Sequence, residues 1–486
     1  TGSGTWQNNT NIDISAFAGM NDVRFAFRYH DGGGWLYGAA LDNIRLVTPD
    51  DIIRAKLNAV SLGKNIAPMP RVVTGYNSLL VGDKVTVRGT VLNDGFPAIT
   101  SYDLTITRGL ETFTENFAGL NIELGKSHTF TYEIPVFAGA NNFDVSVSNI
   151  NGTNDDDPAD NAGSGSINGV EAQPGRKVVI EEGTGPWCGW CPRGAIMMDY
   201  IADQYPDNAI PIAVHNGSTN PMKVVAYDTG LGLTAFPGGK VDRGAAIDPI
   251  NFERDAIPKM TETPRVIITQ DVTWDPNTRQ VEVTSWLNFQ QDLNGLYRIA
   301  VVFTEDDVKG AGSQYAQVNY YAGGAQGPMG GYESLPTPVP ATQMVYNHVA
   351  RAIVGGFTGA AGSVPLTNPA GTVMSYKSTY TVPAAFNIDN MHAITMLVSG
   401  SQIINAEATA IPFASTSAPT VDQTPVSVAI SPNPVQDEAT LTVTVEETSD
   451  VQIRIVDAFG RIVAERIYAD VNGKQYLPFR AGNLAN

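Results

Sequence analysis

The two cysteines of the chain lie in one Cys-x-x-Cys-Pro motif, Cys188 to Pro192, and this motif limits the fold more than any other feature. A strand pattern, "RKVVIEE", comes before it, and apolar side chains recur at helical spacing in "GAIMMDYIADQY" after it. A cysteine at the start of a helix lies near the positive end of the helix dipole, which favours the thiolate. The motif therefore predicts an α/β module in which Cys188 is the nucleophile and Cys191 the resolving thiol.

The patterns around the motif occur in the order of the thioredoxin fold. Between about 172 and 262 they are strand, Cys-x-x-Cys, helix, strand, helix, proline turn and helix. The resemblance to thioredoxins implies that Glu182 is a buried acid that accepts a proton from the resolving cysteine. It also implies that Pro237 is a cis-proline packed against the disulfide. If the module is redox-active, its catalytic residues are therefore Cys188, Cys191, Glu182 and Pro237.

The rest of the chain has the composition of a turn-rich β protein. Glycine (48) and proline (30) are abundant, charged residues are 16% of the total, and short runs alternate apolar with polar residues. A length of 486 residues suggests roughly three to five domains. We therefore expect a mainly β multidomain chain with one α/β thioredoxin-like module. The predicted units are the C-terminal part of a jelly-roll or adhesin-like domain (1–48), a connector (49–70), an immunoglobulin-like β-sandwich (71–171), the thioredoxin-like domain (172–262), a β-sandwich (264–412) and a small β sorting domain (426–486).

Six segments of the central region form a characteristic set: Ile180 to Gly185, Cys188 to Pro192, Ala213 to His215, Asn220 to Met222, Phe236 to Arg243, and 346–359. This set resembles the thioredoxin-fold surface proteins of Gram-negative bacteria that are related to outer membrane protein twenty-eight. The resemblance implies an outer-membrane or cell-surface protein, and it favours adhesion over a defined enzymatic activity.

The C-terminal region contains Pro432-Asn433-Pro434, then alternating apolar residues, then a turn at 457–461 with the sequence "DAFGR". This pattern resembles the type A C-terminal sorting domain of type IX secretion cargo. The resemblance implies the type IX secretion machinery as a partner and an extracellular or outer-membrane-surface location, where Cys188 and Cys191 are expected to form a disulfide. The sequence ends before the last strands of such a domain, so we expect either an incomplete sequence or strands supplied by another copy.

Charge and composition exclude several classes of partner. The net charge of −19 argues against nucleic acid and anionic lipid. No apolar run approaches the roughly 20 residues of a transmembrane helix. The loop "NGTNDDDPADN" is either a candidate calcium site, through Asp155, Asp157 and Asp160, or a solvated turn. The histidines are isolated and predict no zinc site, and no other cofactor is predicted.

Three functions remain open. The leading hypothesis is a secreted cell-surface protein with an adhesive or structural role, which includes a self-assembling extracellular filament subunit. The first alternative is an extracellular thiol-disulfide oxidoreductase that uses the Cys-x-x-Cys pair. The second alternative is a glycan-binding surface protein. We favour a non-enzymatic role, because an extracellular disulfide stays oxidised unless a dedicated reductase acts on it.

Overall fold

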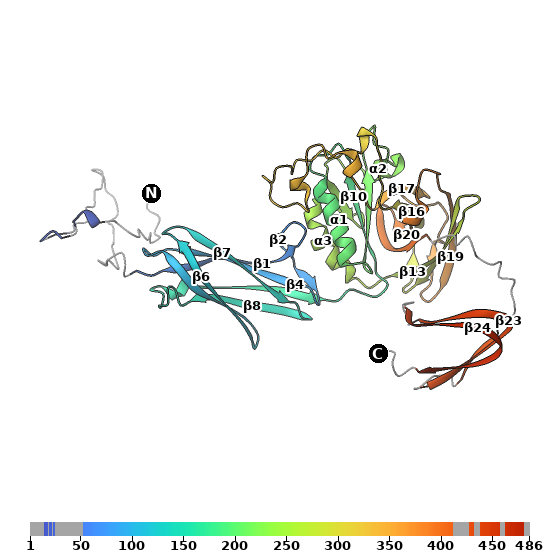
Figure 1. Ribbon diagram of the computed structural model, residues 1–486, viewed down its shortest axis with the longest axis horizontal. Coiled ribbons are helices and arrows are strands. Elements are labelled where there is room, and N and C mark those ends of the chain that lie inside the picture. Colours follow the sequence, from blue (N-terminus) through green and yellow to red (C-terminus); the bar gives the residue numbers. More distant parts are fainter. Residues whose placement is uncertain are drawn as a thin grey trace.

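The computed structural model describes residues 14–17, 19–21, 23–24, 52–411, 427–431, 438–456 and 462–480. The described part is mainly β and contains several sheets (Figure 1). A short 3-10 helix, η1 (Ser15–Phe17), is the one element described before residue 52. Most of the predicted jelly-roll fragment therefore lies outside the described residues. Within the described ranges, no helix combines the length and apolar character needed to cross a membrane.

Residues 55–170 form two facing sheets, as expected for a β-sandwich. Along β4 and β5, buried and exposed residues largely alternate, so one face of each strand reaches a shared core of valine, leucine, isoleucine and aromatic side chains. The first sheet has the order β2 (Arg71–Thr74), β1 (Ala55–Ile66), β4 (Lys84–Asn93), β7 (Ser127–Pro135). The second has the order β3 (Ser78–Leu80), β9 (Ala162–Val170), β8 (Gly139–Ser148), β5 (Ile99–Arg108), β6 (Glu111–Ile122).

The connector predicted at 49–70 is wrong, because most of it is strand β1. This strand pairs with both β2 and β4 and contributes Leu57 and Ile66 to the core. Its pairing with β4 shifts register between Asn58 and Ser61, and Ala59 there has a φ of 51°. The irregularity interrupts the alternation of apolar and polar residues, which is the signal that identifies a strand in sequence.

A seven-stranded sheet forms the centre of the molecule. Its order is β12 (Gly238–Val241), β10 (Val178–Thr184), β11 (Ala209–His215), β17 (Val349–Val354), β16 (Tyr297–Glu305), β20 (Met391–Ser399), β21 (Gln402–Ala410). Every residue of β10 and β11 is buried, as is usual for parallel strands covered on both faces. Helix α1 (Pro192–Gln204) connects these two strands, and α2 (Val225–Leu231), η4 (Pro249–Asn251) and α3 (Phe252–Met260) follow.

The sheet takes strands from both sides of the boundary predicted between 262 and 264. Along β16, alternate residues face two different cores. Ile299, Val301 and Phe303 pack with the three-stranded sheet β13 (Val266–Asp275), β14 (Gln280–Phe289), β19 (Val373–Thr381), whereas Ala300 and Val302 belong to a cluster that includes α2 residues. A small pair, β15 (Leu293–Asn294) and β18 (Thr367–Asn368), accompanies the three-stranded sheet.

The C-terminal part forms a separate antiparallel sheet of β22 (Ser427–Ser431), β23 (Glu438–Val456) and β24 (Ile462–Arg480). The three-stranded sheet agrees with the small β unit that the sequence predicts for residues 426–486. The Pro-Asn-Pro motif and the turn at 457–461 lie outside the described residues. The assignment as a sorting domain therefore stays a prediction.

Candidate functional site

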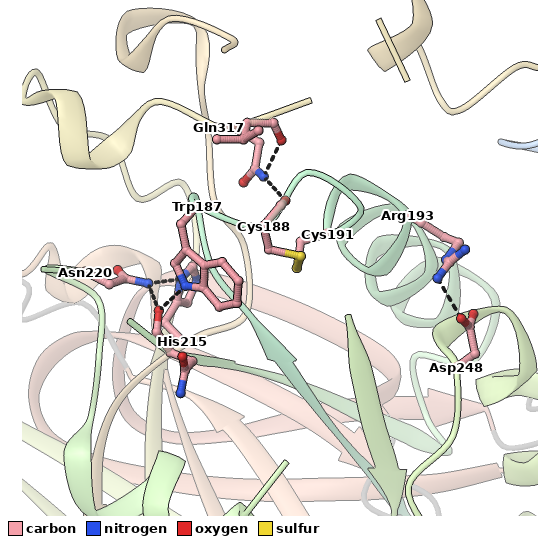
Figure 2. The surroundings of a disulfide bond; sticks show 10 residues. Trp187, Cys188, Cys191, Arg193, His215, Asn220, Asp248 and Gln317 are labelled. Carbon is pink, nitrogen blue, oxygen red and sulfur yellow. Dashed lines mark hydrogen bonds and ion pairs between the residues drawn. A yellow bond between two sulfur atoms is a disulfide. The ribbon is translucent and has the colours of Figure 1, made fainter. Parts of the chain in front are cut away.

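The Cys-x-x-Cys motif lies between the end of β10 and the start of α1, and its two cysteines form a disulfide (Figure 2). The helix begins at Pro192 with Cys191 as its N-cap, so Cys188 lies in the turn before the helix. Proline suits the first helical position, where its missing N–H costs no hydrogen bond. The residues are buried, with 4% of Cys188 and 2% of Cys191 exposed.

A long segment that follows β16 covers this disulfide, and we call residues 313–346 the cap segment. Three of its residues hydrogen-bond directly to the motif. Gln317 donates from Nε2 to the Cys188 carbonyl at 2.8 Å, as Figure 2 shows. The N–H of Val318 donates to Pro186 O at 2.8 Å, and the N–H of Tyr320 donates to Gly189 O at 2.9 Å. These bonds hold the cap segment against the turn that contains Cys188.

The cap segment is itself an ordered structure with internal contacts. Gln317 and Val339 exchange two backbone hydrogen bonds, and the buried Asn319 side chain donates to the carbonyl of Tyr332 at 2.8 Å. Three short 3-10 helices, η5 (Ser313–Tyr315), η6 (Tyr332–Ser334) and η7 (Ala341–Gln343), are its regular elements. The hydrogen bonds explain how a loop of this length keeps a fixed position over the motif.

Aromatic side chains surround the motif on both sides. The ring of Trp190 packs edge-on against Tyr320, with the ring centroids 5.3 Å apart. A Cβ at Gly189 would lie 2.5 Å from the Tyr320 ring, so only glycine allows this approach. On the other side, Trp187 donates from Nε1 to the carbonyl of Asn216 at 2.9 Å, and its ring packs against Phe236. The two tryptophans remain partly exposed at the edges of the covered disulfide.

Glu182 lies beneath the motif, near the end of β10, with 1% of its surface exposed. Burial raises the pKa of Glu182 well above its ordinary value, and Asp199 adds to the rise, whereas hydrogen bonding from Thr184 and the charge of Arg193 oppose it. Its carboxyl packs against α1, where a Cβ at Gly194 would lie 1.7 Å from Oε1. Burial therefore favours the neutral, protonated form of this carboxyl relative to a carboxyl in water.

A cavity of about 70 Å³ separates Glu182 and Cys191 from the surface. Residues of β10, α1, β11 and the cap segment line it, together with residues immediately before β17. The polar and sulfur-containing side chains in its wall are Glu182, Thr184, Cys191, Met198, Asp199, His215, Gln317, Tyr332, Tyr346, Asn347 and His348. The cavity therefore brings two carboxyl groups, Cys191 and two imidazoles to one space.

Two histidines of this wall have different surroundings. His215, at the end of β11, is buried, and burial lowers its pKa to about 3, with the charge of Arg351 adding to the effect. Its Nδ1 lies 3.1 Å from Nδ2 of Asn220. His348 is partly exposed, and its Nε2 lies 3.2 Å from Oδ1 of Asp199. His215 is thus a neutral imidazole inside the protein, whereas His348 contacts a carboxylate at the surface.

The other predicted site residues have these positions. The Phe236–Pro237 peptide is cis, as the resemblance to thioredoxins implies.

In the candidate calcium loop, Asp155 accepts hydrogen bonds from the N–H groups of Ala55 and Asp157. The carboxylate of Asp157 pairs with Arg54, and that of Asp160 lies 3.5 Å from Lys56. In the described part of the chain, no three His, Cys, Asp or Glu residues gather as a metal-binding group. These aspartates therefore have protein partners in the structure, and calcium binding stays a prediction.

The sequence did not identify the cap residues or His348 as part of the site. The available signal was the length of the glycine- and tyrosine-rich stretch at 306–345, because a loop of this length usually has a function. Nothing in that stretch indicates that Gln317 and Tyr320 contact the cysteine motif. Chemically, the arrangement offers a covered disulfide whose second cysteine shares a cavity with a buried acid of raised pKa.

A comparison with protein families gives one match. The family described as outer membrane protein Omp28 matches residues 224–415, which begin after the cysteine motif and include Pro237, the cap segment and His348. No curated protein matches the chain.

Similar solved structures have low scores. A structural-genomics protein from Agrobacterium tumefaciens has 13% identity and a TM-score of 0.31, with 50% of this chain and 97% of that chain covered. The CARDB domain of a Pyrococcus furiosus protein in complex with di-metal ions has 12% identity and a TM-score of 0.18, with 27% and 100% covered. The exo-chitosanase CsxA of Amycolatopsis orientalis has 10% identity and a TM-score of 0.17, with 88% and 76% covered. The match over residues 224–415 supports an Omp28-related protein of the bacterial outer membrane or cell surface.

Proposed function

We propose that this Omp28-related protein has an adhesive or structural role at the cell surface, and that its disulfide is a fixed part of the fold. The observation that carries the proposal is the cover over the motif. Gln317, Val318 and Tyr320 each hydrogen-bond to the turn that contains Cys188, and 4% of Cys188 is exposed. A catalytic thiol-disulfide exchange needs access of a partner thiolate to a sulfur, and the cap segment restricts that access for a protein partner.

Other features are consistent with this role. The chain is acidic, which suits a soluble exposed surface, and most of its described part is β-sandwich and sheet without a large ligand cavity next to the motif. Export by the type IX machinery, binding to surface glycans and assembly with further copies are the partner interactions that we propose for it. Sedimentation velocity measures self-association, and a whole-cell aggregation assay measures adhesion. If the protein shows neither property, the proposed adhesive or structural role is contradicted.

The second candidate function is that of an extracellular thiol-disulfide oxidoreductase. Glu182 favours it, because this buried acid, whose pKa is raised by burial, shares a cavity with Cys191. In this alternative, Cys188 is the nucleophile, Cys191 the resolving thiol and Glu182 the proton donor or acceptor. The cap segment then has to open before a protein substrate binds.

One assay separates the two candidates. The chain is incubated with insulin and dithiothreitol, and its Cys191→Ser variant is used to trap mixed disulfides with envelope proteins. The matched control is the Cys188→Ser/Cys191→Ser double variant, which keeps the fold but has no thiol chemistry. Insulin reduction above this control, with trapped partners, favours the oxidoreductase, whereas activity equal to the control supports the structural role.

A further inference from the structure

We propose that His348 and Asp199 form the outer end of a hydrated proton path that leads through the cavity to Glu182 and supplies the Cys191 sulfur when the disulfide is reduced. This inference concerns the chemistry of the disulfide with any small thiol. It therefore goes beyond the proposed function and does not depend on a biological redox role.

Two polar atoms in the cavity wall indicate that water connects its ends. Glu182 Oε1 and His348 Nε2 are buried and make no well-aligned hydrogen bond to the described protein atoms, although Nε2 lies 3.2 Å from Oδ1 of Asp199. Buried polar atoms of this kind are usually satisfied by ordered water. A cavity of about 70 Å³ is large enough for roughly two water molecules. Water in this space gives both atoms a partner and links the acid to the imidazole.

The outer end of the path is open to solvent. Half of the Asp199 side chain and 18% of the His348 side chain are exposed, and Asn347 beside them is also exposed. Asn347 donates from Nδ2 to Oδ1 of Asp199 at 3.1 Å. Nδ1 of His348 lies 3.5 Å from Asp306. Two carboxylates, Asp199 on α1 and Asp306 just after β16, therefore face the imidazole at the outer end of the cavity.

The inner end of the path is a group that can release a proton to sulfur. Burial raises the pKa of Glu182, and Asp199 adds to this, while Thr184 and Arg193 oppose it. Two further groups in the wall, His215 and Tyr332, have pKa values shifted by burial in the directions that keep them neutral, to about 3 and about 12, and burial also raises the pKa of Tyr346. Glu182 is thus the buried acid that shares the cavity with Cys191, and His348 lies at the end of the cavity that faces solvent.

The reaction with a dithiol reductant has these steps. The reductant thiolate attacks Cys188 Sγ, the bond between the two sulfurs breaks, and its electron pair leaves on Cys191. Glu182 gives its proton to this sulfur and becomes a buried carboxylate, which is costly. A proton from solvent then reaches this carboxylate through His348 and the cavity water. The second thiol of the reductant loses its proton to solvent and attacks the mixed disulfide between the reductant and Cys188. The reductant leaves as a cyclic disulfide, and the Cys188 thiolate takes up a proton.

The test measures the rate at which dithiothreitol reduces the native, full chain. Samples are alkylated at intervals, and free thiols are counted by mass spectrometry. His348 has a φ of 56°, so His348→Asn preserves its backbone better than most substitutions would. We expect His348→Asn to slow reduction about tenfold at pH 7, and Asp199→Asn about threefold, since a positioned proton donor contributes at least this much. Circular dichroism verifies that each variant is folded.

A matched control and a rescue distinguish proton transfer from a structural effect. His392 also contacts Asp306, at 3.5 Å, but it does not line the cavity, so His392→Asn should leave the rate within twofold. His348→Gly leaves space at the same backbone position, and added imidazole should restore most of its rate without affecting the unmodified chain. A rate for His348→Asn equal to that of His392→Asn overturns the proposal. So does a lack of rescue by imidazole, or a native disulfide that dithiothreitol does not reduce without denaturant.

Discussion

The ammonium group of Lys64, on β1 of the sandwich, lies 2.7 Å from Oε1 of Glu253, on α3 of the central region. The Glu253 side chain is fully buried and also accepts hydrogen bonds from Tyr76, Tyr200 and Tyr205 at 2.6 to 3.0 Å. Apolar residues of both regions surround the pair in one continuous cluster. A buried carboxylate with four donors around it therefore connects the sandwich to the helices next to the candidate site.

Replacement of Glu253 by glutamine should destabilise this connection strongly. The change leaves the ammonium of Lys64 in the interior with a neutral partner, and loss of one member of a buried ion pair costs about 3–5 kcal/mol. We expect a loss of about 3 kcal/mol in the free energy of unfolding, measured by urea denaturation with circular dichroism. Asp83, 3.0 Å from Lys64, is the remaining carboxylate for this ammonium.

The exposed pair of Lys84 and Glu133 provides the control. Its charged atoms are 3.8 Å apart, and both side chains are largely in solvent. Lys84→Ala should change the free energy of unfolding by no more than about 1 kcal/mol, as is typical of surface pairs. Equal effects of Lys84→Ala and Glu253→Gln would contradict the role that we assign to the buried pair.

Substitution of Gly189 by alanine should loosen the cap segment. The new Cβ would lie 2.5 Å from the Tyr320 ring, so the ring and its backbone hydrogen bond to Gly189 have to move. Overpacking of this kind typically costs about 1–3 kcal/mol. We expect faster reduction of the disulfide by a phosphine reductant, followed by thiol counting. In the Gly189→Ala/Tyr320→Ala double variant the clash is absent. If the free energy of unfolding of the double variant is as low as that of Gly189→Ala, a clash with Tyr320 is not the cause of the loss.

Much of the site's local structure follows from sequence because it depends on neighbouring residues. Alternating or continuous apolar runs identify β4, β5, β10 and β11, and the periodicity of "GAIMMDYIADQY" identifies α1. The roles of the acid at position 182 and the proline at 237 were implied by the resemblance to thioredoxins. The strand and helix patterns are local in the chain, so a single sequence contains them.

The cover over the disulfide depends on contacts between distant positions and could not be predicted. Gln317 lies 129 residues from Cys188 along the chain, and Asp199 lies 148 residues from Asn347. No periodic pattern marks such contacts, because each is a single hydrogen bond between irregular segments. The sequence also did not predict that one seven-stranded sheet takes strands from both sides of the boundary between 262 and 264. Strand β11 pairs with β17 through a single register pair, Ala213 with Val349, and these residues are far apart in the sequence.

Glu182 should make the chain less stable as the pH rises. Its pKa is raised in the folded state, so its contribution is fully present below its ordinary value of 4.5 and is lost as the pH rises toward the folded value. In this window the loss is about 1.4 kcal/mol per pH unit. Glu182→Gln cannot ionise, and we expect it to match the unmodified chain near pH 4 and to be more stable at pH 7. Urea denaturation of both proteins at pH 4 and pH 7 provides the comparison. If the free energies of unfolding of Glu182→Gln and of the unmodified chain differ by the same amount at both pH values, the raised pKa that we assign to Glu182 is refuted.

His215 should have the opposite pH dependence. Burial lowers its pKa from 6.5 to about 3, so the unfolded chain takes up a proton that the folded chain does not. Its contribution is therefore fully present above pH 6.5 and is lost as the pH falls toward 3. His215→Gln removes this titration. We expect thermal unfolding of the variant to show a smaller decrease between pH 6.5 and 4.5 than that of the unmodified chain, whereas His392→Gln, at a partly exposed position, should leave the decrease unchanged.

Removal of the disulfide should have a modest effect on stability. The two cysteines are three positions apart, so the bond closes a very short loop and limits the unfolded chain little. Loop-closure entropy predicts a contribution of about 2 kcal/mol for such a loop. We expect Cys188→Ser/Cys191→Ser to unfold with a free energy lower by about this amount and to keep its circular dichroism spectrum. Because the cap segment binds the motif through backbone carbonyls of Cys188, Pro186 and Gly189, it should stay in place without the sulfur bond. Hydrogen exchange at the N–H groups of Val318 and Tyr320 measures this directly, and their rapid exchange in the folded double variant would mean that the disulfide itself holds the cap.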